Sequence, residues 1–208
     1  MEMKRSALAA ELKASLHDAG GLFDAVDDAD FARFIDLAAA DLGRVRPLLR
    51  RASFDLQADA DASGCYPTPA DFRDFHSTSW GTGHGIAPWS ANYPGEMPRV
   101  RCLRTAAGQV LELSIAPSPR QLALLGSRYA YRYYASHAVL EDPTQTTVRP
   151  QDRGLLLLRA QAEACKELAI RNVVKPMALR DGMSQGPRNG TPAALFAELM
   201  RLFEEARQ

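Results

Sequence analysis

The stretch RYAYRYYASHAVL, residues 128–140, decides how this chain folds. It holds four of the chain's 6 tyrosines, at positions 129, 131, 133 and 134, and His137 follows them. A catalytic cluster, a nucleic-acid stacking platform and a buried packing helix would each explain so many rings in so few residues. The surrounding sequence has to distinguish these three explanations.

Two prolines before the stretch, Pro117 and Pro119, favour the start of a helix, which we expect to run from about residue 119 to residue 140. At about 100° per residue, Tyr131 falls on the side opposite the apolar stripe, and Tyr134 lies about a third of a turn from it. The stripe consists of Leu122, Leu125, Tyr129, Tyr133, Ser136 and Leu140. Rings that surround a helix do not converge as a catalytic cluster requires. We therefore expect this helix to lie between its own core and a neighbouring element or subunit.

Composition and charge exclude several classes of protein. The 208 residues, 46% hydrophobic and 24% charged, are enough for one domain with a core, or for one domain with arms. Lys+Arg and Asp+Glu are each 25, so the chain lacks the basic excess that a non-specific nucleic-acid binder needs. We expect no sequence-specific DNA binding, and a regulatory DNA-binding protein remains only an alternative that predicts salt-dependent affinity for DNA.

The cysteines and the N-terminus indicate a cytoplasmic protein. Cys65, Cys102 and Cys165 are odd in number and form no CxxC pair, which argues against a disulfide framework or a zinc site. The first residues lack the apolar core of a signal peptide, and no stretch approaches the roughly 20 apolar residues of a membrane span. We expect no contact with a membrane.

Four further helices and little strand are predicted. Residues 3–18 favour a short helix that ends at Gly20 and Gly21. The next helix begins among aspartates at 24–30 and ends near Val45, where the arginines at 44, 46, 50 and 51 suit the negative end of the helix dipole. Residues 53–60 indicate a short strand, and residues 99–116 a β-hairpin with a turn at 106–108. Another helix is predicted over about 150–172.

The segment 64–98 is rich in glycine and proline, and it contains both tryptophans, Trp80 and Trp89. Disordered segments are poor in aromatic residues, so we interpret it as an ordered, long, irregular loop that packs on something. A second glycine-rich stretch, 176–190, is predicted to be a linker. It leads to Thr191-Pro192, a favourable N-cap followed by proline at the first helical position.

The terminal helix that begins there is amphipathic. Its apolar face consists of Leu195, Phe196, Leu199, Leu202 and Phe203. Because it follows a linker, this face has to dock somewhere, either onto the chain's own core or onto a neighbouring chain. The sequence leaves both alternatives open.

No motif predicts a catalytic, cofactor-binding or metal site. The glycine-rich GTGHG at 81–85 lacks the Lys-Ser/Thr of a phosphate-binding loop, and no GxSxG motif is present. The histidines at 17, 76, 84 and 137 have no metal-ligand spacing, and the aspartates at 24–30 do not match a calcium-binding loop. A small cytoplasmic enzyme that uses His84, His137 or the tyrosines remains an alternative without a nucleophile–base pair to support it.

The order of these pieces nevertheless carries a resemblance. A helix ending in RVRPLLRRA leads into a short strand and then YPTPADFRDFHSTSWG, with the pattern Tyr-x-x-Pro-x-Asp-Phe followed by Trp80. A hairpin ending in LELSIAPSP, a helix with RYAYRYYASHAVL, and a long helix LLLLRAQAEACKELAIRN after TTVRPQDRGLL complete the series. Over roughly residues 28–175, this series resembles the head–tail connector, or adaptor, proteins of tailed bacteriophages.

The resemblance implies a virion protein of the phage neck, present in the host cytoplasm during assembly, and not an enzyme. Such a protein would form a homo-oligomeric ring, dodecameric in this family, beneath the portal protein. The ring would extend the channel through which DNA passes in packaging and ejection, and would present a surface to the next neck or tail-completion protein. Another neck, head-completion or tail-completion protein of related architecture is the alternative.

The predicted fold is mainly α with a small β element. It is a helical bundle that carries a β-hairpin at about 99–116, a long aromatic-rich loop and a C-terminal arm with a terminal helix. The predicted organisation is an N-terminal helical segment at 1–27, a connector-like helical domain at 28–175, and a linker with the terminal helix at 176–208. Subunit or partner contacts are predicted at Tyr131, Tyr134, Trp80, Trp89, Arg44, Arg46, Leu195, Phe196, Leu199 and Phe203.

Overall fold

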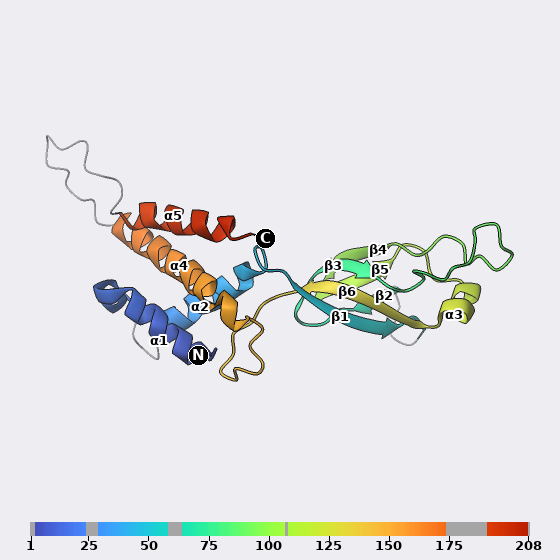
Figure 1. The fold of residues 1–208 in the computed structure, drawn as a ribbon, viewed down its shortest axis with the longest axis horizontal. Coiled ribbons are helices and arrows are strands. Elements are labelled where there is room, and N and C mark those ends of the chain that lie inside the picture. Colours follow the sequence, from blue (N-terminus) through green and yellow to red (C-terminus); the bar gives the residue numbers. More distant parts are fainter. Residues whose placement is uncertain (1–2, 24–28, 58–63, 107, 174–190, 208) are drawn as a thin grey trace. The chain divides into compact units, whose positions relative to one another are not determined.

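The chain divides into two compact units, and the second is inserted in the sequence of the first. A computed structural model describes residues 3–23, 29–57, 64–106, 108–173 and 191–207 (Figure 1). One unit combines residues 1–47 with 137–208, and the other consists of residues 48–136. The sequence predicts boundaries after residues 27 and 175, whereas the chain passes from one unit to the other after residues 47 and 136.

The first unit is helical. Its elements are α1 (Arg5–Ser15), η1 (His17–Leu22), α2 (Ala29–Leu42), η3 (Pro150–Asp152), α4 (Arg153–Val173) and α5 (Pro192–Glu205). The predicted helices in these regions are confirmed, with ends that differ by a few residues. The predicted linker at 176–190 and most of the aspartate run at 24–30 lie outside the described residues.

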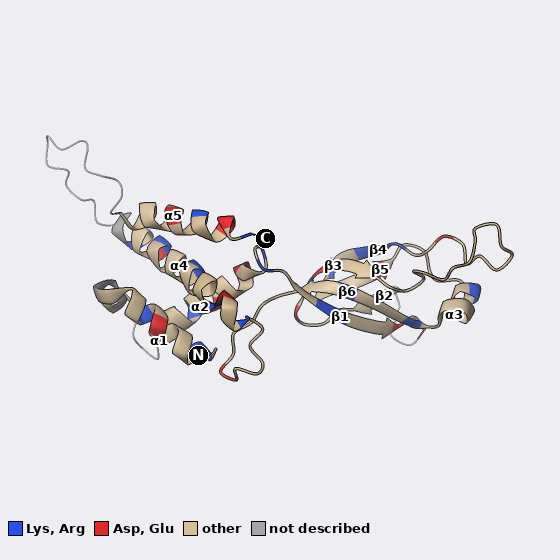
Figure 2. Ribbon diagram, in the orientation of Figure 1, with Lys and Arg blue, Asp and Glu red and all other residues tan. Residues whose placement is uncertain are grey.

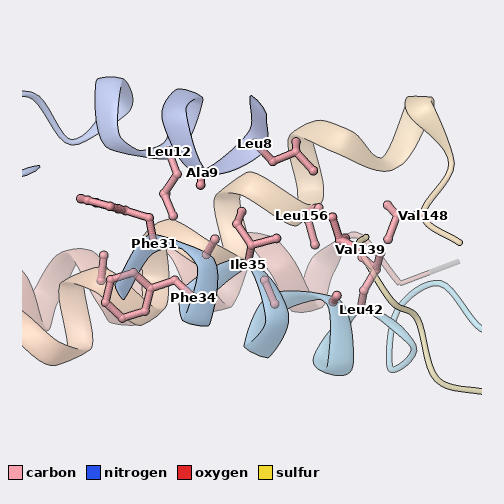
Figure 3. Packing of buried hydrophobic residues seen from close by; sticks show 14 of the residues in the cluster. Leu8, Ala9, Leu12, Phe31, Phe34, Ile35, Leu42, Val139, Val148 and Leu156 are labelled. Atoms are coloured by element: carbon pink, nitrogen blue, oxygen red, sulfur yellow. The ribbon is translucent and has the colours of Figure 1, made fainter. Parts of the chain in front are cut away.

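The core of the helical unit follows from the 3.6-residue period of α2. Phe31, Phe34, Ile35, Ala38 and Leu42 recur at this spacing, and all are buried. Figure 3 shows side chains of α1, α2 and α4 meeting in this layer, together with residues from the 139–148 region. Phe23 packs edge-on against two phenylalanines of α2, at ring-centroid distances of 5.7 and 5.2 Å, which closes one end of the core.

The second unit is built on two antiparallel sheets. Sheet A has the order β1-β6-β3, from β1 (Leu48–Asp55), β6 (Arg128–Ala135) and β3 (Phe72–Thr78). Sheet B has the order β2-β5-β4, from β2 (Cys65–Pro67), β5 (Gly108–Leu113) and β4 (Val100–Thr105). The seven-residue helix α3 (Pro119–Leu125) connects β5 to β6.

An aromatic core fills this β unit. Phe54 of β1 lies between the rings of Tyr66 and Tyr129, stacked at centroid distances of 4.0 and 5.0 Å. Trp80 lies beside Tyr129, at 5.6 Å. Leu111 and Leu113 of β5 complete the cluster, so the residues that bury this core come from both sheets.

The prediction of a helix from about 119 to 140 is wrong beyond Leu125. Gly126, with a φ of 80°, ends α3, and the chain continues as β6. Along β6 the buried positions are 129, 131, 133 and 135, a period of two that places these side chains on one face of a strand. Tyrosine favours strands, and the stretch pairs with β1 over all eight residues.

The predicted fold class is therefore wrong as well. Within the described ranges there are two three-stranded antiparallel sheets beside the helices, so the fold is α+β and not a helical bundle with one hairpin. The hairpin itself is confirmed as β4 and β5. The strand expected at 53–60 begins earlier, directly after Pro47, and β2 and β3 occupy the first part of the segment 64–98 that was expected to be a loop.

Candidate interaction surfaces

Three of the four histidines make contacts within their own units. His137 lies 2.8 Å from the carbonyl oxygen of Arg46 through Nε2, and since a carbonyl only accepts, Nε2 carries the proton and donates it. The other ring nitrogen lies 3.3 Å from the hydroxyl of Thr147. In the second unit, Nδ1 of His84 accepts a hydrogen bond from the backbone N–H of Ile86 at 3.0 Å. The His76 ring lies edge-on to that of Tyr134, at 5.2 Å.

The tyrosines also serve the fold. Tyr131 is only 2% exposed, and burial raises its pKa to about 12, so it stays neutral at physiological pH. The Tyr133 hydroxyl donates a hydrogen bond to Asp71 at 2.9 Å, and the same carboxylate forms an ion pair with Arg50. The structure thus places Tyr131 in the core, where it offers no contact area to a partner. Tyr134 is half-buried and faces the other side of the sheet.

The two tryptophans have opposite environments. Trp80 is buried in the aromatic core, and its indole N–H donates a hydrogen bond to the carbonyl of Gly126 at 3.0 Å. Trp89 is 89% exposed, in the segment 79–99 that lies between β3 and β4. Tryptophan is enriched among the residues that dominate binding energy at protein interfaces. Both tryptophans are predicted to contact a partner, but only Trp89 is accessible to one.

Arg44 and Arg46, both predicted as partner contacts, bind instead to the C-terminal end of α5 and the residue that follows it. Arg44 forms ion pairs with Asp41 and with Glu204, at 3.4 and 3.2 Å. Arg46 pairs with the buried Asp152 at 3.2 Å and donates to the carbonyl of Ala206. Both arginines therefore act within the helical unit.

Helix α5 docks onto its own helical unit, which decides between the two alternatives that the sequence leaves open. Phe203 is fully buried in the core that α1, α2 and α4 share, and Met200 packs against the same core. Phe196 and Leu199 are partly buried. Leu195 and Leu202 remain 49% and 40% exposed, and with Leu199 they form an apolar strip that we call the α5 leucine edge.

The buried Arg159 contacts the residue that anchors α5, Phe203. Arg159 of α4 donates to Asp41 at 2.8 Å and to Glu163 at 2.6 Å, and its guanidinium lies 5.9 Å from the ring centre of Phe203. Burial alone would lower the pKa of Arg159, but the hydrogen bonds to the two carboxylates outweigh it and raise the pKa above its usual value. This ion-pair network joins α2 and α4 and supports the ring that anchors α5.

The sequence interpretation missed a surface on sheet A. Because β1 and β6 pair in register, Leu49 lies opposite Tyr134, Arg51 opposite Arg132 and Ser53 opposite Ala130. These six residues, together with Asp55 and Arg128, which lie opposite each other, form what we call the outer face of sheet A, the face turned away from the aromatic core. The alternation in RYAYRYYA was the signal that could have revealed it. Figure 2 shows basic positions along β1 and β4 of this unit.

Two absences hold for the described ranges. No group of three or more His, Cys, Asp or Glu residues there has the arrangement to hold a metal ion. No helix there has the length and apolar character needed to cross a membrane. Comparison with known proteins found no family model and no curated protein that matches the chain.

Proposed function

We propose that this chain is a structural subunit of a tailed-phage neck, a head–tail connector that assembles into a ring beneath the portal. The observation that carries the proposal is the presence of two different uncovered apolar surfaces in two different units. The α5 leucine edge belongs to the helical unit, and the exposed Trp89 belongs to the β unit.

Ring assembly requires this kind of asymmetry. A head-to-tail contact that closes into a ring joins one patch of a subunit to a different patch of the next. An apolar strip on a helix and an exposed indole ring are chemically suited to such a contact, because leucine and tryptophan bury a large apolar area. A two-fold dimer, by contrast, needs only one self-complementary patch.

The engagement of the reactive side chains also favours a structural role over catalysis. His137, Tyr131 and Tyr133 are held by burial or by hydrogen bonds within their own units, and the hydroxyl beside His137, that of Thr147, is itself hydrogen-bonded to the backbone of Ala138. The resemblance of residues 28–175 to connector proteins points the same way. It rests on the order of the motifs, and one piece of that series differs in the structure, because RYAYRYYA forms β6 and not a helix.

Light scattering during size-exclusion chromatography tests the proposal, on the chain alone and mixed with the portal protein encoded by the same phage genome. We expect a ring-sized species, or a complex that co-elutes with the portal. Replacement of Leu195 and Leu202 by glutamate, or Trp89→Ala, should remove that species while the melting temperature stays within a few degrees of the parent.

Leu22→Glu is the matched control, because Leu22 is an exposed leucine outside both surfaces. It should assemble like the parent chain. A chain that stays monomeric in both runs would overturn the proposal, whereas a complex only with another neck protein would favour the alternative of a different neck or completion protein.

A further inference from the structure

The strand edges of the β unit are not equivalent. β2 has only three residues and ends in Pro67, and β3 contains two register shifts along β6. β4 lies beside β3, where the thiol of Cys102 contacts the backbone of Phe75. β1 is eight residues long, pairs with β6 without interruption, and has no second neighbour among the described strands. Natural proteins usually protect such an edge, because its backbone can pair with another chain.

The hydrogen-bond pattern identifies the backbone groups that point away from β6. The N–H of Leu56 donates to the carbonyl of Ser127, in the same register as the ladder, so the even-numbered residues of β1 form the hydrogen-bonded pairs. The N–H and C=O groups of Leu49, Arg51 and Ser53 therefore point to the open edge. No hydrogen bond from these groups to a described residue is present.

Positive charge exceeds negative charge on the outer face, since Arg51 lies opposite Arg132 and only Arg128 has an acidic residue, Asp55, opposite it. Arg51 and Arg132 are a non-hydrogen-bonded pair, in which opposite Cα atoms are only about 4.5 Å apart. Like charges directly opposite each other destabilise a sheet. Neither arginine, nor Arg128 further along β6, has a carboxylate within ion-pair distance in the described part of the chain.

We propose that the open edge of β1 accepts an extended acidic segment of a partner protein as a fourth strand of sheet A. The edge groups of Leu49, Arg51 and Ser53 supply the backbone hydrogen bonds, as in other strand-addition interfaces. A carboxylate opposite Arg51 lies on the outer face and neutralises the Arg51–Arg132 pair. The inference goes beyond ring formation, which concerns the α5 leucine edge and Trp89.

A second copy of this chain fits the edge poorly. Antiparallel pairing of β1 with another β1 would bring Arg50 and Arg51 of that copy to the edge, which adds positive charge where negative charge is needed. β4 also carries two exposed arginines, Arg101 and Arg104. An acidic partner is the occupant that the charges favour.

Binding of designed peptides to the full-length chain tests this proposal, with fluorescence anisotropy for affinity and amide chemical shifts for location. The probe is an eight-residue peptide of alternating valine and glutamate, and its counterpart alternates valine and lysine. We expect the glutamate peptide to bind at least tenfold more tightly, more weakly at high salt, with shifts centred on Leu49, Arg51 and Ser53. Arg51→Glu should reverse the preference between the two peptides.

Ser53→Pro separates the contribution of backbone hydrogen bonds to peptide affinity from the contribution of charge. It removes an N–H that points to the open edge and leaves the ladder with β6 intact, whereas Ser53→Ala keeps that N–H. We expect the proline variant to lose at least tenfold in affinity and the alanine variant to bind like the parent. Melting curves establish that both are folded.

Three results would overturn the proposal. The two peptides could bind the parent chain equally or not at all. The shifts could lie away from β1. A DNA duplex could bind in an Arg51-dependent manner while the glutamate peptide does not, which would make the outer face a nucleic-acid surface. Ring assembly is measured by light scattering with the α5 and Trp89 variants, so failure here and failure of the proposed function are distinguishable.

Discussion

The helical unit and the β unit use arginine in opposite ways. In the described part of the helical unit, every arginine except Arg207 forms an ion pair, most of them between different elements; these are the arginines at 5, 33, 44, 46, 149, 153, 159, 171 and 201. In the β unit, within the part the structure describes, only Arg50 and Arg99 do so. Residues 48–136 contain nine arginines and no lysine. A formal net charge of zero therefore conceals one unit in which most described arginines form ion pairs and one in which most do not.

The difference shows that overall charge is a poor guide to what a surface binds. Balance over the whole chain excludes a general nucleic-acid binder, but it does not describe a single sheet face. In the helical unit, a positive side chain next to two carboxylates stabilises the fold. In the β unit, a positive side chain opposite another positive side chain destabilises it unless something else binds there.

The largest expected effect is in the helical unit. Arg159→Ala leaves Asp41 and Glu163 without their buried partner, and removing one member of a buried ion pair costs about 3–5 kcal/mol. Urea denaturation should therefore show a loss of about this size. Because Arg159 lies over Phe203, we also expect α5 to become more susceptible to proteolysis.

Arg201→Ala is the matched control, since Arg201 pairs with Glu198 and Glu205 on the exposed side of α5. Such surface pairs contribute roughly 0–1 kcal/mol. Equal losses in the two variants would contradict the idea that the helical unit depends on its buried arginine.

The next largest effect is a loss of stability at alkaline pH in the β unit. We expect the stability of this unit to depend on its aromatic core more than on its charges. Burial raises the pKa of Tyr131 to about 12, above the value near 10 expected in the unfolded chain. The folded state then holds its proton more tightly, so stability is full below about pH 10 and falls as the pH rises from there towards 12. A difference of about 2 pKa units corresponds to at most about 3 kcal/mol.

Equilibrium unfolding between pH 8 and pH 12 measures this loss, and Tyr131→Phe, which cannot ionise, is the comparison. Burial also raises the pKa values of Tyr129 and Tyr66, so the variant should reduce the alkaline loss without abolishing it. An unchanged alkaline profile in the phenylalanine variant would show that Tyr131 does not control it.

The helical unit was more predictable from sequence than the β unit, for physical reasons. The apolar residues of α2 have a single period, and Pro47 limits its extent, so its position follows directly. In the stretch 128–135, Tyr129 and Tyr133 satisfy a helical period, while 129, 131, 133 and 135 satisfy a strand period. Local pattern does not decide between them. Pairing with β1, about 80 residues earlier in the sequence, does.

The candidate surfaces were predicted in part. The exposed Trp89 and the α5 leucines could be identified from residue type and helical spacing. Arg44 and Arg46 could not be assigned, because their partners Glu204, Asp152 and Ala206 lie more than 100 residues away in sequence. The outer face of sheet A was missed because it exists only once β1 and β6 are side by side.

The smallest expected effect is a gain of stability, whereas Arg159→Ala is expected to lose stability. Arg51→Thr removes one of two like charges that face each other, and threonine favours strands, so we expect the chain to gain about 0.5 kcal/mol in urea denaturation at low salt. The gain should shrink in 0.5 M salt, because screening already weakens the repulsion. Arg132→Thr should give a similar gain, and the double variant should gain less than the sum, because each substitution removes the same repulsion. A loss of stability in both single variants would mean that these arginines are matched within the chain, and the contrast between the two units would then disappear.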